Sequence, residues 1–483
     1  MRAVMRDSVN DQRATALRAV TNGSPLDVLV VGGGIVGAGV ARDAAMRGLR
    51  VALVERADFA SGTSSRSSRL LHGGLRYLAQ GRIGLVREAS VEKLVVTRIA
   101  PHLAQPMPFV FPTRAGTVWR PWKLRIGTKA YDALCGLGRN LGKSDWLDRE
   151  QVLSLLPGLN PEGLSGAVRY FDALTNDARL VIDTIRSAAN SGATVLNYAP
   201  LTSAEQRDGG VWHCRVEDTI GKNSIDLTAR CVVNASGPWA NLFPASKVKL
   251  RLTKGVHLVI DRARLPIPSA VVMTSGKRVL FAIPWGERVI LGTTDTDYSG
   301  DPSAPTVEPE DVAYVLDITN ETFRDARLTA GDVISSWAGL RALTGARPDA
   351  AGMPSDISRR HQVRMSAPGW LDVTGGKLTT YRLMAEQTVD LIAKHLGKRL
   401  KKCATAMTPL LPANDPGLAF SGILPPPVSR EAVEHYARNE WAVSVEDVMV
   451  RRTSWRYVHR EHSRIVDSVS EWITHSNTSG AAK

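Results

Sequence analysis

The stretch Leu26–Gly37, LDVLVVGGGIVG, decides the fold class of this chain. Its first six residues are nearly all apolar and rich in valine, which is typical of a buried parallel strand. They lead into GGGIVG, a match to GxGxxG, and residues 38–47 then predict a helix closed by Gly48. Residues 50–54 predict a second buried strand, which ends at Glu55. This strand–helix–strand unit is the dinucleotide-binding fingerprint of a Rossmann-like domain.

Each conserved position of that fingerprint has its own physical task. Gly32 allows a tight turn, Gly34 lets the backbone approach a pyrophosphate, and Gly37 lets the helix pack close to the strand. Glu55 is placed to accept hydrogen bonds from a ribose. The structural alternative is a glycine-rich turn that binds no dinucleotide.

The segment Ser61–Leu78, SGTSSRSSRLLHGGLRYL, favours FAD over NAD as the dinucleotide. After the acidic residue an NAD domain usually continues into another crossover unit, whereas here hydroxyls and backbone amides follow that can line a pyrophosphate and a ring system. Residues 230–235 predict a strand that delivers Gly237 to a point of close approach. Residues 369–381, GWLDVTGGKLTTY, predict a strand that runs through two glycines into a helix over 380–396, whose positive end suits a reduced, anionic flavin.

Length and composition bound the rest of the interpretation. With 483 residues, 43% of them hydrophobic, we expect a globular enzyme of two or three domains. The four cysteines form no CxxC pair, so a compact metal or dithiol motif is excluded and a reducing, cytoplasmic location is favoured. We expect no signal peptide, no metal and no membrane-spanning segment, since the longest apolar run has too few residues to cross a bilayer.

The net charge of +14 allows three kinds of partner: nucleic acid, an anionic membrane surface or an anionic small substrate. The densest basic cluster is Arg451–Arg464, in which Trp455 and Tyr457 are interleaved. A solvated helical face is one interpretation of this cluster, and a contact with anionic lipid is the other.

Nine stretches of the chain carry a resemblance to a known family. In order they are 27–39 DVLVVGGGIVGAG, 63–78 TSSRSSRLLHGGLRYL, 100–109 APHLAQPMPF, 177–181 DARLV, 234–239 NASGPW, 254–257 KGVH, 283–285 IPW, 292–302 GTTDTDYSGDP and 375–382 GGKLTTYR. The chain resembles the FAD-dependent glycerol-3-phosphate dehydrogenases of the respiratory, membrane-associated type. HGGLRYL is highly specific to that family, whereas GxGxxG is not.

The resemblance implies an α/β fold with a Rossmann-like FAD-binding domain, an antiparallel-sheet substrate domain and a short C-terminal helical segment. The expected ranges are 1–24 for an N-terminal tail; 25–100, 170–250 and 335–400 for the FAD-binding domain; 101–169 and 251–334 for the substrate-binding domain; 401–427 for a linker; and 428–483 for a shortened helical cap. The cap is shorter than is usual in the family.

The resemblance also implies the site. Substrate binding falls to Arg76, Tyr77, His257, Arg341 and Lys377, of which His257, Arg341 and Lys377 are the expected catalytic residues. The expected FAD-binding residues are Gly32, Gly34, Gly37, Glu55, Thr63, Ser64, Ser65, Ser68, His72, Gly73, Gly74, Gly237, Gly376, Lys377, Leu378 and Thr379.

The expected reaction is oxidation of glycerol 3-phosphate at C2, with electrons passed to a quinone or another acceptor. Arginine suits the phosphate because its planar guanidinium offers paired donors. Neutral imidazole acts as a base near pH 7, which favours His257 for the hydroxyl proton, while Lys377 or Arg341 can stabilise the developing oxyanion. The alternatives are purely structural roles: a structural His257, a core Arg341 paired with a carboxylate, and a capping or surface Lys377.

Other functions stay open at this point. A glycerol-3-phosphate oxidase that uses O₂ is close to the main interpretation, an amino-acid or amine oxidase shares the fold, and a flavin-binding paralogue without turnover is the non-enzymatic alternative. The expected partners are glycerol 3-phosphate, the electron acceptor, an anionic membrane surface on the inner face of the cytoplasmic membrane and a second copy of the chain, but no nucleic acid.

Overall fold

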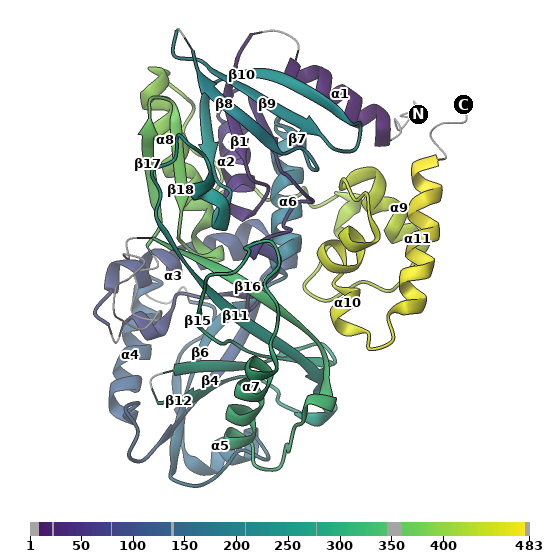
Figure 1. The fold of residues 1–483 in the computed structure, drawn as a ribbon. Helices are drawn as coiled ribbons and strands as arrows, with labels where there is room; N and C mark the ends of the chain where they lie inside the picture. The colour runs from purple at the N-terminus through teal and green to yellow at the C-terminus, as the bar shows by residue number, and fades with distance from the viewer. Residues whose placement is uncertain are drawn as a thin grey trace.

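A computed structural model describes residues 9–21, 24–78, 80–136, 140–207, 209–276, 278–344 and 360–478. Within these residues two sheets form the framework, with helices against both of them and a separate group of helices at the C-terminal end (Figure 1). The predicted α/β class with a Rossmann-like sheet, a second sheet and a short C-terminal helical segment is confirmed.

The first sheet has eight strands among the described residues, and β1 lies at its centre. The strand order is β17 (Gln362–Ala367), β18 (Trp370–Thr374), β10 (Asn223–Asn234), β1 (Leu26–Val31), β2 (Val51–Val54) and β7 (Thr194–Leu196), with β9 (Trp212–Asp218) beside β10 and β8 (Leu201–Gln206) beside β9. β1 pairs in parallel with β2 on one side and β10 on the other. Open α/β sheets bind ligands beyond the carboxyl ends of the strands at such a switch point.

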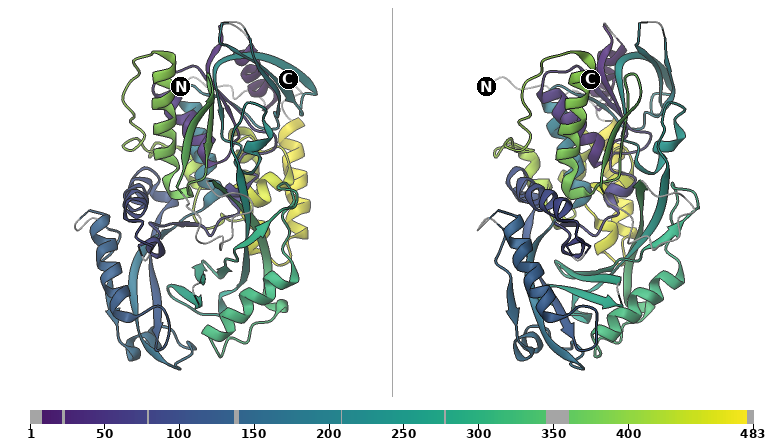
Figure 2. Two further views of the ribbon diagram at one scale, coloured as in Figure 1. Left: turned by 60° about the vertical axis from the view of Figure 1, so that its left-hand side comes forward. Right: turned by 90° about the vertical axis from the view of Figure 1, so that its left-hand side faces the viewer.

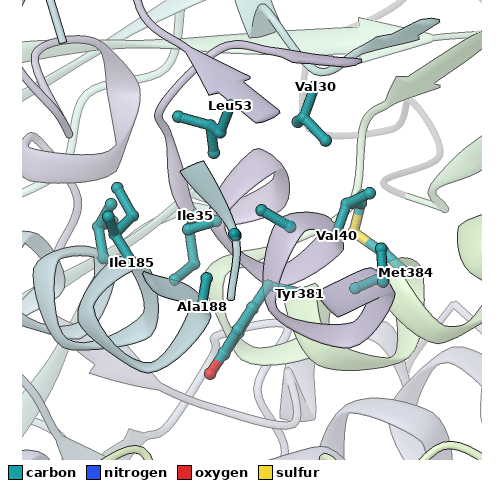
Figure 3. Packing of buried hydrophobic residues seen from close by; sticks show 14 of the residues in the cluster. Val30, Ile35, Val40, Leu53, Ile185, Ala188, Tyr381 and Met384 are labelled. Atoms are coloured by element: carbon teal, nitrogen blue, oxygen red, sulfur yellow. The ribbon is translucent and has the colours of Figure 1, made fainter. Parts of the chain in front are cut away.

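Three helices pack together on this sheet: α2 (Ile35–Met46), α6 (Asp177–Asn190) and α8 (Tyr381–Leu396). Figure 3 shows their buried side chains meeting residues of β1 and β2, with Tyr381 and Met384 of α8 against α2. The close approach depends on Gly39, where a Cβ would lie 2.9 Å from the Tyr381 ring. α2 begins three residues before the predicted start at residue 38, because Gly34 already caps it in an extended conformation.

The second sheet has ten strands among the described residues and is antiparallel except for the β4–β12 pair. Its order is β15 (Thr296–Tyr298), β11 (Leu250–Asp261), β14 (Arg288–Gly292), β13 (Arg278–Trp285), β12 (Ala270–Ser275), β4 (Gln105–Arg114), β6 (Leu164–Leu174) and β3 (Leu70–Leu71), with β16 (Val333–Thr344) paired to β11 and β5 (Asp145–Leu147) paired to β6. The helices around it are α3 (Ile83–Ile99), α4 (Pro121–Leu134), α5 (Arg149–Leu155) and α7 (Pro309–Thr322), which lie in the lower part of Figure 2 or between the two sheets.

Some predicted range limits fall inside strands. The limit at 169/170 lies within β6, and the limit at 334/335 lies near the start of β16. In the structure both strands belong to the second sheet along their whole length. Residues 9–21, within the predicted N-terminal tail, form the helix α1 (Val9–Thr21), which Arg13 ties to Asp218 at 2.7 Å. The rest of that tail lies largely outside the described residues. The division into domains stays a prediction.

The C-terminal helices form one cluster with its own core. They are α9 (Arg430–Asn439), the π-helix η10 (Asp447–Arg452), α10 (Trp455–Val458) and α11 (Ser463–Thr478). Buried residues such as Tyr436, Met449 and Trp455 hold them together. Figures 1 and 2 show this group beside both sheets. In the described part of the chain, no helix combines the length and the apolarity that crossing a membrane requires.

Candidate active site

A cavity of about 1800 Å³ runs between the two sheets, and most of the predicted site residues line it. Its walls include the β1–α2 turn, the Ser-rich segment, β11, β16 and the loop that follows β18. Gly37, Ser65 and Gly73 were predicted to bind the cofactor, but they lie behind the wall rather than on it. Their contribution is to packing.

The glycines of the fingerprint make room for the turn and for the cavity. Gly32 has a φ of +112°, and a Cβ there would lie 2.6 Å from the Ala235 carbonyl oxygen. A Cβ at Gly37 would overlap the carbonyl oxygen of Gly32, so this residue lets helix and strand approach, as predicted. Gly34 is different because it has an ordinary extended conformation and lines the cavity, with Ser64 Oγ 3.1 Å from the position of a Cβ.

Glu55 lies at the end of β2 on the cavity wall. Its carboxylate accepts hydrogen bonds from the backbone N–H of Gly33 at 2.7 Å and of Ala57 at 3.0 Å. The pKa of Glu55 is raised, because burial outweighs these two hydrogen bonds, which lower it. Each oxygen of an ionised carboxylate can accept more than one hydrogen bond, so Glu55 holds the glycine turn and keeps capacity for a ribose hydroxyl.

The hydroxyls of the Ser-rich segment bond mainly to protein groups. Thr63 donates to the Leu340 carbonyl at 2.7 Å, Ser64 accepts from the Ile35 N–H at 3.1 Å, and Ser68 Oγ lies 2.8 Å from Nε2 of His257. The sequence predicted that these side chains face a cofactor. They do line the cavity, but they also fix the β1–α2 turn, β16 and His257 relative to one another.

The HGG loop is held from behind by buried groups. Gly73 N–H donates to the Tyr131 hydroxyl at 2.7 Å, and that hydroxyl donates to Asp172 at 2.5 Å. Lys93 Nζ lies 2.9 Å from the same Asp172 oxygen. Burial, followed by the Asp172 charge, raises the pKa of Tyr131 well above its ordinary value, so the phenol stays protonated. The His72 N–H donates to Thr379 Oγ1 at 3.1 Å, which joins this loop to the loop after β18.

His257, on β11, is buried and neutral. Burial, then the charge of Arg341, then that of Arg69 lower the pKa of His257 to about 3. Its ring stacks on Trp337 with centroids 5.3 Å apart and an interplanar angle of 20°. Ser68 contacts Nε2, and Nδ1 has no hydrogen-bond partner among the described residues. A neutral imidazole in a fixed orientation has one ring nitrogen that carries no proton, and that nitrogen can accept one.

The other predicted substrate residues line the same cavity. Arg341 is ion-paired with Asp295 at 3.0 Å and donates to Thr293 Oγ1 at 3.1 Å. Lys377 Nζ lies 4.3 Å from the centroid of the Tyr77 ring. Arg76, whose Cζ lies 5.5 Å from the same centroid, also lines the cavity. The structure therefore brings together residues from four separate parts of the sequence.

Sequence reasoning missed several residues of this environment. Asp295, Thr293 and Trp337 contact Arg341 or His257, and Tyr131 and Asp172 support the HGG loop. The motif GTTDTD contains two of these residues and was a usable signal. The other three follow only from tertiary packing.

Both sequence interpretations of the Arg451–Arg464 cluster are wrong for its first half. Arg451 and Arg452 are buried and ion-paired with Asp58 at 2.5 and 2.8 Å, and Trp455 is fully buried. Only Arg456, Arg460 and Arg464 of the basic residues are exposed. A buried carboxylate attracts arginine more strongly than solvent or lipid does, and this attraction is invisible in a linear charge pattern.

Comparison with known proteins gives the family. Residues 27–382 match the family described as FAD dependent oxidoreductase. Over 407 residues the chain is 39% identical to the aerobic glycerol-3-phosphate dehydrogenase of Staphylococcus aureus (strain USA300), covering 82% of this chain and 71% of that protein. The counterpart from Staphylococcus haemolyticus (strain JCSC1435) is 38% identical over 399 residues, with coverages of 80% and 70%.

Two solved structures share the fold. The glycerol-3-phosphate dehydrogenase from Bacillus halodurans complexed with FAD superimposes with a TM-score of 0.75 at 29% identity, covering 98% of this chain and 96% of that one. The FAD-bound L-alpha-glycerophosphate oxidase from Mycoplasma pneumoniae gives a TM-score of 0.63 at 18% identity, with coverages of 81% and 100%, and its similarity concerns the fold alone. With the glycine turn and the long cavity already described, these matches lead to one conclusion: the chain belongs to the family of FAD-dependent oxidoreductases.

Proposed function

We propose that the protein oxidises sn-glycerol 3-phosphate to dihydroxyacetone phosphate. The observation that carries this proposal is a neutral, buried His257 beside Arg341, in a cavity that Lys377 and Arg76 also line. The substrate combines a secondary alcohol, which must lose a proton, with a phosphate dianion, which needs cations. The 39% identity to an aerobic glycerol-3-phosphate dehydrogenase supports the same reaction.

The residues of the cavity fit FAD. At one end, the Gly34 position opens onto the cavity at the start of α2, where backbone N–H groups and the helix dipole favour a pyrophosphate. Glu55 lies beside this turn for the ribose. Gly376, Leu378 and His72 also line the cavity and would hold the flavin part of the cofactor. When bound there, FAD supplies the acceptor for the hydride from C2 of the substrate.

His257 takes the proton of the C2 hydroxyl in this proposal. The Trp337 ring and the Ser68 hydroxyl fix the orientation of the imidazole, which lowers the entropic cost of placing it at the substrate. Its low pKa is partly due to Arg341. A phosphate dianion beside Arg341 offsets that charge and therefore raises the pKa of His257 while the substrate is bound.

Arg341 and Lys377 act on the anionic parts of the substrate. Arg341 is held by Asp295 and Thr293, so its guanidinium is oriented before the substrate arrives. Asp295 also shares the charge of Arg341, which reduces the net attraction for a phosphate. Lys377, over the Tyr77 ring, stabilises the oxyanion that develops at C2.

The reaction is tested by a steady-state assay with an artificial dye as electron acceptor. Wild-type protein loaded with FAD is expected to convert glycerol 3-phosphate to a product that an NADH-linked assay identifies as dihydroxyacetone phosphate. Glycine and proline serve as control substrates for the amino-acid-oxidase alternative. Turnover of either amino acid at a rate above that of glycerol 3-phosphate contradicts the proposal.

We further propose a quinone as electron acceptor and an anionic membrane as the working surface. α4 and the residue stretch before it carry Val118, Trp122 and Ile126, which are 57%, 56% and 63% exposed and also line the cavity. Lys123 and Arg125 are exposed on the same helix. Apolar side chains at the cavity mouth, flanked by cations, suit a lipid surface that holds an apolar acceptor. A homodimer stays a proposal as well.

Vesicle co-sedimentation tests the membrane proposal. Trp122→Ala combined with Ile126→Ala is expected to weaken binding to anionic vesicles at low and high salt, because apolar insertion is lost. Two control variants keep the α4 face: Met407→Ala, at a site that is 69% exposed, and Arg456→Ala with Arg460→Ala in the C-terminal segment. If the Arg456/Arg460 variant loses binding and the Trp122/Ile126 variant does not, the membrane contact is not at α4.

A further inference from the structure

Arg69 is a buried cation for which the proposed reaction has no task. It follows Ser68 in the chain, is 1% exposed and has a φ of +55°, a conformation that residues other than glycine adopt only infrequently. Nη2 donates to Ser454 Oγ at 3.0 Å, and Nε lies 3.9 Å from an Asp177 oxygen. Nε and Nη1 have no hydrogen-bond partner among the described residues. Such an arrangement is costly, which calls for an explanation.

Three aromatic rings enclose the Arg69 guanidinium. Its Cζ lies 4.3 Å from the Trp285 centroid, 5.4 Å from Trp337 and 5.7 Å from Tyr457. These distances are within the range of cation–π attraction, which strengthens where water is excluded. The enclosure combines strands β13 and β16 with the C-terminal helix α10, and the Tyr457 carbonyl is itself anchored by Ser335 of β16 at 2.8 Å.

Trp337 connects this enclosure to the active site. The Trp337 ring contacts Arg69 and Tyr457, and it also stacks on His257. The indole N–H donates to the Ser67 carbonyl at 3.2 Å, so the segment that carries Arg69 also fixes the indole. Ser68, between these two residues in sequence, contacts Nε2 of His257. Three consecutive residues, Ser67, Ser68 and Arg69, therefore contact either His257 or the Trp337 ring that stacks on it.

We propose that Arg69 is a positioning residue for His257, which it holds through Trp337 and keeps neutral through its positive charge, with Ser454 and Tyr457 of the C-terminal cluster completing its enclosure. The inference deepens the proposed function, because it rests on His257 as the proton acceptor. It also gives the C-terminal cluster a role at the substrate end of the cavity.

The charges around His257 differ in whether a substrate can reach them. Arg341, paired with Asp295, lines the cavity, as does Lys377, so a bound phosphate can offset these cations. Arg69 lies behind the aromatic rings and outside the cavity wall, with Asp177 as its only nearby carboxylate among the described residues. Its field on His257 therefore persists in the substrate complex. The lowered pKa of His257, which has Arg69 among its causes, agrees with this arrangement.

The test compares Arg69→Met with Arg69→Lys in the FAD-loaded protein. Carbon-13-labelled histidine gives the NMR titration of each ring, and the spectrum of His257→Asn assigns the His257 signal. Removal of the charge in Arg69→Met is expected to raise the pKa of His257 by at least half a unit and to move the acidic limb of the kcat/KM profile to higher pH. Arg69→Lys, which keeps the charge, is expected to restore most of the wild-type titration.

Arg42→Met is the matched control, because Arg42 is equally buried but bonds to Ser187 and Thr408 on the far side of α2. It is expected to leave the His257 titration unchanged. An unchanged His257 titration in Arg69→Met overturns the inference. A shifted titration with an unchanged kcat/KM profile leaves the positioning role intact and instead contradicts His257 as the proton acceptor of the proposed function.

A second pair of variants keeps the test decisive if Arg69→Met does not fold. Tyr457→Leu removes one wall of the enclosure and lets water screen Arg69, whereas Tyr457→Phe keeps the ring. The pKa of His257 is expected to rise in Tyr457→Leu and to stay at the wild-type value in Tyr457→Phe. Equal titrations in these two variants contradict the inference.

Discussion

Gly34 is the residue whose substitution separates cofactor binding from folding. Its conformation suits any amino acid, so Gly34→Val leaves the β1–α2 turn intact while the new side chain extends toward Ser64 and into the cavity. We expect the variant to purify as folded apoprotein, without the visible flavin spectrum and with the far-ultraviolet circular dichroism of the wild type. A fully yellow Gly34→Val protein contradicts this position for the pyrophosphate.

Arg341 is the residue expected to distinguish the phosphate of the substrate. Arg341→Ala removes a charge-assisted contact worth about 1.5–3 kcal/mol, so kcat/KM for glycerol 3-phosphate is expected to fall by about 10- to 150-fold. Glycerol lacks the phosphate and is expected to be a poor substrate that loses little more. Equal losses for the two compounds show that Arg341 does not bind the phosphate. Asp295→Asn is a useful companion, since it frees the Arg341 charge and is expected to tighten phosphate binding.

His257 makes the stability of the protein depend on pH. Its pKa is about 3 in the folded chain and about 6.5 when unfolded, so below pH 6.5 the unfolded chain binds a proton that the folded chain does not. As the pH decreases below 6.5, the free energy of unfolding therefore decreases by up to about 1.4 kcal/mol per pH unit from this residue alone. Between about pH 6.5 and pH 5, the melting temperature is expected to decrease more steeply for wild type than for His257→Gln. Parallel curves for the two proteins mean that His257 is not buried in its neutral form.

The sequence was most informative about residues whose task is set by the backbone. Gly32 and Gly37 occupy the predicted turn, because a positive φ or a close approach leaves no choice of residue. It was less informative about polar residues. Ser64 and Ser68 were predicted as cofactor-binding residues, and only the tertiary structure shows that Ile35 and His257 are their partners. Arg69 gave no signal, since an arginine among serines is usually exposed.

The C-terminal cluster is the element that the sequence described least well. Its helices were predicted, but its basic residues were assigned to solvent or lipid. In the structure Asp58, three residues after Glu55, accepts hydrogen bonds from both Arg451 and Arg452. The neighbouring Phe59 meets Trp441 edge-on at 5.6 Å. The cluster thus supports the segment that leads from β2 into the Ser-rich loop.

Disruption of this ion-pair cluster is expected to destabilise the protein strongly. Asp58→Asn removes the carboxylate that Arg451 and Arg452 share, so that, among the described residues, Arg451 keeps Asp447 at 2.6 Å and Arg452 keeps only Glu440 at 3.8 Å. Breaking a buried pair typically costs about 3–5 kcal/mol. We expect a lower midpoint of urea unfolding and faster release of FAD, monitored by flavin fluorescence. Asp226→Asn, which breaks the exposed Arg215–Asp226 pair, is the control and is expected to leave the midpoint unchanged. Equal midpoints for the two variants mean that the cluster does not support the cofactor end.

At the scale of the whole molecule, two sheets and a C-terminal cluster contribute to one cavity. The first sheet supplies the glycine turn and Glu55, the second supplies His257 and Arg341, and the loop after β18 adds Lys377. A linear pattern predicts each strand, but not which sheet β16 joins, because that choice depends on pairing with β11 far away in the sequence. The expected range 335–400 assigned β16 to the FAD-binding domain, whereas the structure pairs it with β11 of the second sheet.

Anaerobic reduction of the bound flavin shows whether the protein oxidises glycerol 3-phosphate. FAD-loaded protein is mixed with glycerol 3-phosphate in the absence of O₂ and of any added acceptor, and the visible absorbance is followed by stopped flow. The account predicts bleaching of the flavin band at a saturable rate, with little bleaching by glycerol and much slower bleaching in His257→Gln. A flavin that stays oxidised in the presence of saturating glycerol 3-phosphate contradicts the account.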